Sequence, residues 1–279
     1  PPPHAEIAAR GAGLVEAGLW LRPTVFPEAG EGDWRVSCDR EVRMVRGSVG
    51  VCDVSTLGKI EVAGPDAGRF LDRVYANAVS TLPIGRVRYA IMLREDGFVM
   101  DDGTVARMGE DRFLLTTTTA AAEEVEAHLA FALQGLWPEL DARGVPVTEQ
   151  WAQVAVAGPR ARELLDRVLE SPGDAALPFM AWGQARVGGV AGRLFRISFS
   201  GELGYELAVP ARFGAALFAL LAEEARGLGG GPYGLEALNV LRIEKGFLTH
   251  AELHGRTTAG DLGLGRMVAA KDCIGKAGA

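Results

Sequence analysis

The sequence predicts an α+β protein made of two related halves, each an antiparallel sheet with packed helices. The first observation is an internal repeat, in which residues 59–74 are echoed by residues 153–168. Both copies read as a strand, then Val-Ala-Gly-Pro, then an amphipathic helix that ends in Leu-Asp-Arg-Val. The second is a set of short strand-like runs bounded by glycine turns after each copy. We therefore expect a segment at 1–50, a first half at 51–145 and a second half at 146–279.

Bulk composition excludes several classes of protein. The formal charge of −7 argues against a general nucleic-acid surface, although a local basic pocket for an anion stays open. No apolar run approaches the roughly 18 residues that a membrane-spanning helix needs, and no signal peptide is visible. The three cysteines, Cys38, Cys52 and Cys273, form no CxxC pair, which predicts a reducing, cytoplasmic setting without disulfides or structural zinc.

A β-hairpin is expected around an Asp-Gly turn at residues 96–97. Apolar runs at 89–93 and 98–100 flank this turn, and glycine reaches the positive φ that tight hairpins require. The return strand is expected to end in Asp101 and Asp102. Because successive strand side chains point to opposite faces, one of the two carboxylates at most enters a given pocket.

A second acidic residue lies on a similar strand after a glycine turn. Residues 193–199 are strand-like, residues 200–204 form the turn, and residues 205–209 form the next strand. Alternation places Tyr205 on the face opposite Glu206.

A helix over residues 234–246 carries an arginine on its apolar face. Leu235, Leu238 and Arg242 follow helical spacing, so the guanidinium projects with the core leucines. An unpaired buried charge costs several kcal/mol, so Arg242 needs an anionic partner. An internal ion pair and a bound anionic ligand both satisfy this requirement.

The remaining elements are less informative. We expect a flexible entry segment that contains Gly11-Ala-Gly13, which lacks the preceding strand and the spacing of a phosphate loop. A helix is expected at 35–49, a strand leading into an N-cap at 111–119, a helix at 120–133 and a linker at 137–144.

Several motifs in register resemble the tetrahydrofolate-binding aminomethyltransferase family. This family includes the glycine cleavage T-protein and the C-terminal halves of dimethylglycine-type dehydrogenases and of the heterotetrameric sarcosine oxidase α subunit. The resemblance is strongest to the sarcosine oxidase α subunit and runs from about residue 15 to residue 275. The motifs are residues 53–60, 95–102, 200–206, 241–246 and 261–267.

The resemblance implies a tetrahydrofolate site between pseudo-symmetric halves, where a one-carbon unit is captured as 5,10-methylenetetrahydrofolate. Asp102 matches the family's catalytic carboxylate, Glu206 its pterin-binding glutamate, Arg242 its folate-contacting arginine and Tyr89 an aromatic that lines the ring. Phe199 stands where relatives often carry Tyr. Judged from the residues alone, Asp102 and Glu206 could equally be strand-end or surface carboxylates, and Tyr89 a core aromatic.

The chemistry that the resemblance implies suits these residue types. A carboxylate such as Glu206 accepts two parallel hydrogen bonds from the N3–H and 2-amino group of a pterin. A carboxylate near N10, assigned to Asp102, stabilises the developing positive charge and takes up the released proton. Arg242 would meet the folate tail carboxylates. No metal is required, and Glu252 between His250 and His254 breaks the zinc motif that their spacing suggests.

Two functional classes stay open. The first is a folate-dependent transferase, working with flavin-bearing oxidase subunits on a sarcosine-like amine, or with a lipoyl carrier protein in glycine cleavage. The second is a non-catalytic folate-binding or assembly module. Family members usually continue past residue 275 into a small β-barrel, and sarcosine oxidase α subunits carry a dinucleotide-binding N-terminal half. Neither is present in this sequence, so we expect either a fragment of a longer protein or a truncated gene product.

Overall fold

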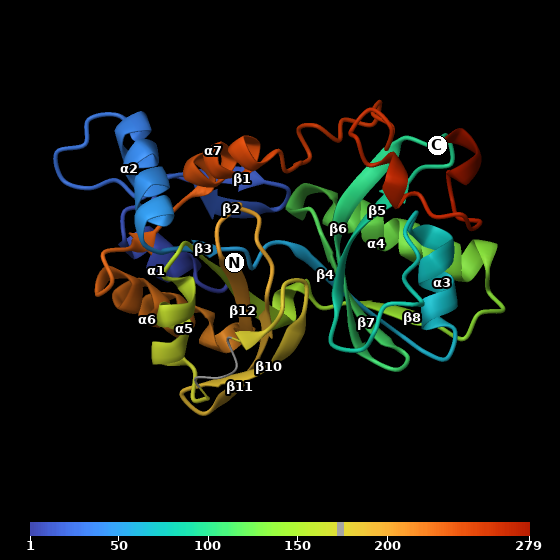
Figure 1. Ribbon diagram of the computed structural model, residues 1–279, viewed down its shortest axis with the longest axis horizontal. Helices are drawn as coiled ribbons and strands as arrows, with labels where there is room; N and C mark the ends of the chain where they lie inside the picture. The colour runs from blue at the N-terminus through green and yellow to red at the C-terminus, as the bar shows by residue number, and fades with distance from the viewer. Residues whose placement is uncertain (172–175) are drawn as a thin grey trace. The chain divides into compact units, whose positions relative to one another are not determined.

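The computed structural model describes residues 1–171 and 176–279, which divide into two compact units (Figure 1). Unit 1 comprises Pro1–Thr56 and Glu149–Phe247, and unit 2 comprises Leu57–Thr148 and Leu248–Ala279. The expected halves are continuous in sequence, whereas each of these units is assembled from two separate segments. The reason is that strands far apart in the sequence pair with each other. The local periodicity of hydrophobic residues does not encode such pairing.

Unit 2 contains a five-stranded antiparallel sheet of order β5-β6-β7-β4-β8. A 3₁₀ turn at Thr119–Ala121 precedes α4, and a π-helical turn at Ala132–Leu136 follows it. The elements are β4 (Gly58–Ala63), α3 (Ala67–Val74), β5 (Val87–Leu93), β6 (Val99–Gly109), β7 (Arg112–Thr117), α4 (Ala122–Phe131) and β8 (Arg143–Pro146).

Unit 1 contains a six-stranded sheet of order β10-β11-β12-β9-β3-β13, with a separate β1-β2 hairpin. The pairing is antiparallel except between β13 and β3, which run parallel. The elements are α1 (His4–Ala9), β1 (Leu14–Ala17), β2 (Trp20–Pro23), α2 (Trp34–Gly47), β3 (Gly50–Asp53), β9 (Trp151–Ala157), α5 (Ala161–Val168), β10 (Trp182–Val187), β11 (Val190–Phe195), β12 (Gly204–Pro210), α6 (Gly214–Arg226), β13 (Gly231–Pro232) and α7 (Leu235–Lys245).

The internal repeat is a structural duplication. In unit 2 the chain runs β4-α3-β5-β6-β7-α4, and in unit 1 it runs β9-α5-β10-β11-β12-α6. The strand orders β5-β6-β7-β4 and β10-β11-β12-β9 correspond position by position. The α+β prediction of two related halves, each with helices on an antiparallel sheet, is therefore confirmed.

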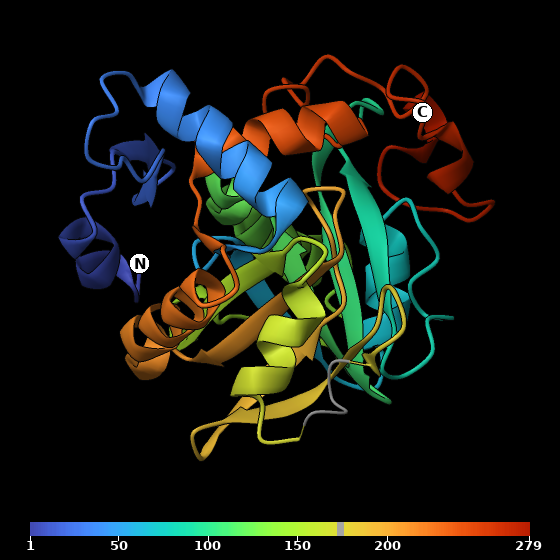
Figure 2. The same ribbon diagram turned by 60° about the vertical axis from the view of Figure 1, so that its left-hand side comes forward.

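Each sheet buries both of its faces. In unit 1, Val154 and Val156 of β9 pack with α5 and α6, while Ala155 and Ala157 face a second cluster that includes α2 and α7. Figure 2 shows α2 and α7 side by side. In unit 2, α3 and α4 cover one face, and residues from 248–279 cover the other face near β5 and β6.

Some local expectations need correction. The residues on either side of Gly11-Ala-Gly13 form α1 and the β1-β2 hairpin rather than a flexible entry segment, and Arg143 and Gly144, expected in the linker, begin strand β8. The strand expected at 193–199 ends at Phe195, and the helix expected at 35–49 ends at Gly47. No side chain caps the 3₁₀ turn before α4.

None of the helices in the described parts of the chain is long and apolar enough to cross a membrane.

The two Val-Ala-Gly-Pro turns depend on glycine. Gly64 and Gly158 have φ of 134° and 132°, values that residues with a side chain rarely adopt. Each glycine carbonyl accepts the amide of the first helical residue, three positions on. The intervening proline thus occupies the second position of a turn before the helix cap, and not the first helical turn that the sequence suggested.

Gly158→Ala is expected to lower the free energy of unfolding by about 2 kcal/mol or more, because strained backbone and a steric clash add together. A Cβ there would lie 2.4 Å from the carbonyl oxygen of Ser48. Urea denaturation measures the loss. Gly32→Ala is the matched control, since its Cβ would meet nothing within 4 Å. Equal stability of both variants would contradict the prediction.

Candidate functional site

The first part of the candidate site is the β5-β6 hairpin of unit 2. Gly97 has φ of 86°, as the Asp-Gly turn predicts. Strand β6 continues to Gly109, so the two carboxylates lie inside the strand rather than at its end. Asp102 lies opposite Ile91, and the Tyr89 hydroxyl donates a hydrogen bond of 2.6 Å to Asp102 Oδ2. The structure therefore brings two of the expected site residues into direct contact.

Burial sets the protonation of this pair. Desolvation raises the pKa of Asp102 above its usual range, and the negative charge of Glu252 acts in the same direction. The hydrogen bonds from Tyr89 and Thr118 oppose the rise. Burial also raises the pKa of Tyr89 well above its usual value, so its hydroxyl stays a hydrogen-bond donor at neutral pH. Asp102 is thus a carboxylate with increased proton affinity and a fixed donor beside it.

Asp101 lies on the opposite face of β6 and is 2% exposed. It pairs in register with Met92, which belongs to the core under α3 and α4. Desolvation raises the pKa of Asp101 to about 7. The alternation of strand side chains predicted that Asp101 and Asp102 would lie on opposite faces of β6. It did not predict that Asp101 would be buried in the hydrophobic core.

Glu206 lies in unit 1 at the middle of β12. It pairs with Ala155 of β9, which in turn pairs with Cys52 of β3, so the three residues form a row across one face of the sheet. Tyr205 and Leu207 pack into the core on the other face, as alternation predicted. Glu206 is 9% exposed, so its carboxylate lies among apolar neighbours rather than at the surface.

Gln153 orients Glu206 and was not foreseen from the sequence. Its side-chain amide donates a hydrogen bond to Glu206 Oε2. The Gln153 backbone is held in turn by Ser55, whose hydroxyl oxygen accepts the Gln153 amide at 2.9 Å. The sequence did carry one signal, because Gln153 is a polar residue that alternates with Ala155 and Ala157 on a buried strand.

Arg242 lies on α7, which begins after Gly234 and ends at Gly246 in the left-handed conformation. The arginine is 6% exposed, as its position among the core leucines predicted. Nε donates to the Asn239 side-chain oxygen at 3.3 Å, and Nη1 donates to the Phe247 carbonyl at 3.1 Å. These neutral oxygens orient the guanidinium. Whether its charge meets an internal acid or a ligand stays a prediction.

An aromatic pair lies close to Arg242 in unit 1. The ring of Phe199 stacks on that of Phe247 with centroids 6.1 Å apart. Phe199 also packs against the cluster that contains Cys52 and Leu238. The ring of Phe199 is therefore held by apolar contacts on this side of the sheet.

Metal and thiol chemistry find no support in these residues. Cys52 is 1% exposed, and burial raises the pKa of its thiol to about 12, so it behaves as a small apolar side chain. Among the described residues, no group of three or more His, Cys, Asp or Glu side chains is placed to hold a metal ion.

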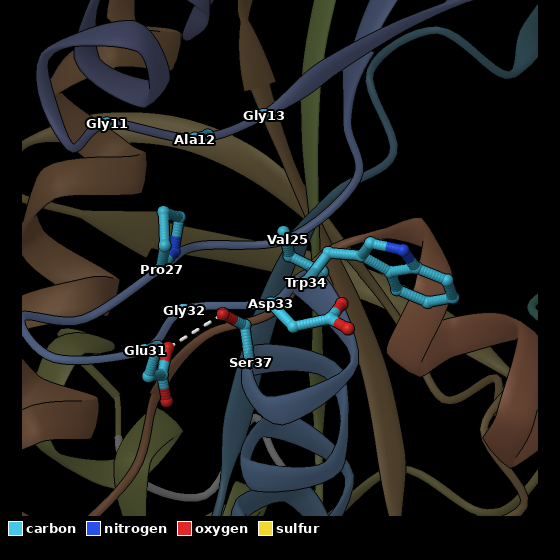
Figure 3. Close-up of a pocket in the computed structure, with 10 residues that line it drawn as sticks. All are labelled: Gly11, Ala12, Gly13, Val25, Pro27, Glu31, Gly32, Asp33, Trp34 and Ser37. Atoms are coloured by element: carbon cyan, nitrogen blue, oxygen red, sulfur yellow. Dashed lines mark hydrogen bonds between the residues drawn. The ribbon is translucent and has the colours of Figure 1, made fainter.

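A hollow of about 300 Å³ lies beside Gly11-Ala-Gly13 in unit 1 (Figure 3). The Ser37 hydroxyl donates to Glu31 at 2.7 Å, and Arg40 lowers the pKa of Glu31 to about 2. Asp33 adds a second carboxylate to the lining. Negative charge disfavours phosphate here, in agreement with the incomplete glycine motif.

The comparisons with known proteins agree with this fold. The GCVT N-terminal domain model matches residues 3–272. Sarcosine oxidase subunit alpha of Rhizobium meliloti is 53% identical over 99% of this chain and 28% of its own length. An aminomethyltransferase of Corynebacterium jeikeium is 30% identical over 94% of this chain and 68% of its own.

A solved structure has the same fold. The crystal structure of glycine cleavage system aminomethyltransferase T from Bartonella henselae superposes with a TM-score of 0.84, at 24% identity, over 100% of this chain and 73% of its own. The chain spans less than a third of the length of the sarcosine oxidase subunit. Because the family model covers nearly the whole chain, this chain belongs to the GCVT N-terminal domain family.

Proposed function

We propose that this chain is a tetrahydrofolate-dependent one-carbon transferase domain, which captures the carbon released from a sarcosine-like N-methyl amine as 5,10-methylenetetrahydrofolate. The observation that carries the proposal is the half-buried Tyr89–Asp102 pair, in a chain 53% identical to a sarcosine oxidase subunit alpha. Flavin-bearing oxidase subunits would then be its partners, since oxidation of the amine needs a redox centre.

The residues present suit a folate. Glu206 is a carboxylate oriented by Gln153, and a carboxylate is the group that accepts a pterin's paired donors in bidentate fashion. Arg242 donates to two neutral oxygens, and a planar guanidinium is the group that pairs with carboxylates such as those of a folate tail. We assign pterin binding to Glu206 and tail binding to Arg242.

Asp102 is assigned the proton transfer. Tetrahydrofolate supplies the nucleophilic nitrogens, and closing the five-membered ring releases a proton. A carboxylate whose pKa is raised by burial accepts that proton more readily than an exposed carboxylate does. Its negative charge would also stabilise positive charge that develops beside it during the transfer. Tyr89 keeps the carboxylate oriented by donating to Oδ2.

A second candidate is the glycine-cleavage type of transfer, from an aminomethyl group on a lipoyl carrier protein. The 30% identity to an aminomethyltransferase over 94% of this chain favours it. Purified chain is incubated with tetrahydrofolate and either formaldehyde or an aminomethylated lipoyl carrier, and methylene product is measured. Formaldehyde condenses with tetrahydrofolate unaided, so rates are compared with a mixture that lacks the protein. Acceleration with formaldehyde that the carrier does not increase supports the first candidate. Carrier dependence supports the second, and no acceleration with either leaves the non-catalytic folate-binding module.

Glu206→Ala is expected to weaken tetrahydrofolate binding at least tenfold, because a charge-assisted bidentate contact is worth roughly 1.5–3 kcal/mol. Calorimetric titration with reduced tetrahydrofolate measures the dissociation constant. Glu126→Ala, at an exposed glutamate of α4, is the control and should bind like the wild type. Unchanged affinity in Glu206→Ala would remove Glu206 from the site.

A further inference from the structure

Asp101 is a buried carboxylate to which no role has been assigned. It is 2% exposed, and its Oδ1 lacks a hydrogen-bond partner among the described residues. Its side chain lies on the face of β6 that α3 and α4 cover, and Asp102 lies on the other face. Asp101 therefore cannot touch a ligand that meets Asp102. Any effect that it has on the chemistry passes through other residues.

Thr118 connects the two carboxylates. Its backbone amide donates to Asp101 Oδ2 at 3.2 Å, and its hydroxyl oxygen lies 3.5 Å from Asp102 Oδ1. Thr118 follows β7 and precedes the 3₁₀ turn, but its side chain does not cap that turn. The hydroxyl lies within reach of the Asp102 carboxylate and also acts on that of Asp101. One residue thus contacts both acids, Asp101 through its backbone amide and hydroxyl and Asp102 through its hydroxyl.

We propose that Asp101 is a positioning residue for Asp102. Through Thr118, it fixes where the Asp102 carboxylate points. Through its own charge on the opposite face of β6, it also sets how readily that carboxylate takes up a proton. This inference rests on the proposed function only where it concerns catalytic turnover.

The electrostatic surroundings support this coupling. The charge of Asp101 acts on Tyr75, which follows α3, and across the sheet on Tyr89 of β5, and burial keeps both hydroxyls protonated. Glu252 acts on Asp102 from the segment 248–279. The charges of Asp101 and Asp102 act on each other, and burial together with this coupling raises the pKa of Asp101 to about 7. Once Asp101 is ionised, its charge lies in a poorly solvated region, where charge interactions are stronger than in water. A proton on Asp102 then becomes more favourable.

The test is a direct titration of Asp102 by carbon-13 NMR of the aspartate carboxyl groups, with Asp102→Asn identifying its signal. Asp101→Asn should lower the pKa of Asp102 by about one unit, because a nearby like charge is removed. Thr118→Val should raise it, because a hydrogen bond to the charged form is lost. Thr118→Ser keeps the hydroxyl and should restore the wild-type value.

Turnover gives the second measurement. The acidic limb of the kcat profile should move to lower pH in Asp101→Asn, and kcat should fall about tenfold in Thr118→Val with little change in KM. An Asp102 pKa that is the same in wild type, Asp101→Asn and Thr118→Val would overturn the inference. The titration needs no turnover, so a chain that shows the coupling without transferring carbon refutes the proposed function alone.

Stability provides a further check on Asp101 itself. Its pKa is raised in the folded state from 3.8 to about 7, so the folded state binds the proton more tightly than the unfolded state does. The stability of the wild type relative to Asp101→Asn should therefore fall as pH rises from about 4 to about 7. A stability difference that does not change with pH over that range would show that Asp101 does not titrate there. The effect of its charge would then be removed from the inference.

Discussion

Asp102→Asn is expected to slow one-carbon transfer by roughly 10²- to 10⁴-fold, the usual contribution of a general base. The amide has nearly the same shape as the carboxylate and can still accept the hydrogen bond from Tyr89. It can neither take up a proton nor balance positive charge. Formation of methylenetetrahydrofolate from formaldehyde measures the rate, and calorimetry should show that tetrahydrofolate binding is retained.

The control for this variant is Asp39→Asn on α2, where the side chain is 68% exposed and should leave the rate unchanged. Tyr89→Phe removes the hydrogen bond to Asp102 without removing the carboxylate. A smaller loss, of about tenfold, is expected there. Full activity in Asp102→Asn would refute the catalytic assignment and favour a binding module.

Glu41→Ala is expected to lower the free energy of unfolding by about 3 kcal/mol, because it leaves two buried amides without an acceptor. Glu41 is fully buried. Its Oε1 accepts the amide of Phe26 at 2.6 Å, and its Oε2 accepts that of Gly234 at 2.8 Å. The carboxyl thereby joins the segment before α2 to the start of α7. Urea denaturation of the variant measures the loss.

The effect of Glu41→Ala should depend on pH. Burial raises the pKa of Glu41 in the folded state from 4.5 to about 7, so its stabilising contribution is largest below pH 4.5. The stability difference between wild type and variant should shrink as pH rises toward 7. Asp39→Ala, on the exposed side of the same helix, serves as control. A loss in Glu41→Ala no greater than in Asp39→Ala would contradict the bridging role.

Local pattern predicted a large part of the fold. The repeat gave two strand–helix pairs, and alternation placed Glu206 opposite the core face of β12. Helical spacing likewise placed Arg242 among buried leucines. These inferences succeeded because each depends on a few consecutive residues. The roles of Asp102, Glu206, Arg242 and Tyr89 remain predictions, to be decided by the variants described above.

Features that depend on contacts between residues far apart in the chain could not be predicted from the sequence. Strand β3 pairs with β9 across the whole of the first half, and β13 joins the same sheet in parallel. The contact of Gln153 with Glu206 and the link through Thr118 are also non-local. Burial of Asp101 and Glu41 follows from packing of helices on sheets, and neither residue type predicts it.

Because the segments of the two units alternate along the chain, the parts of each unit become available for folding at different times during synthesis. During synthesis β3 emerges long before its partner β9, and unit 2 lacks the segment 248–279 until the end of the chain has been made. Non-local pairing of this kind slows folding and leaves strand edges exposed meanwhile. Neither unit can complete its core until its second segment has been made. Cutting the chain at either crossover would therefore separate parts of the same core.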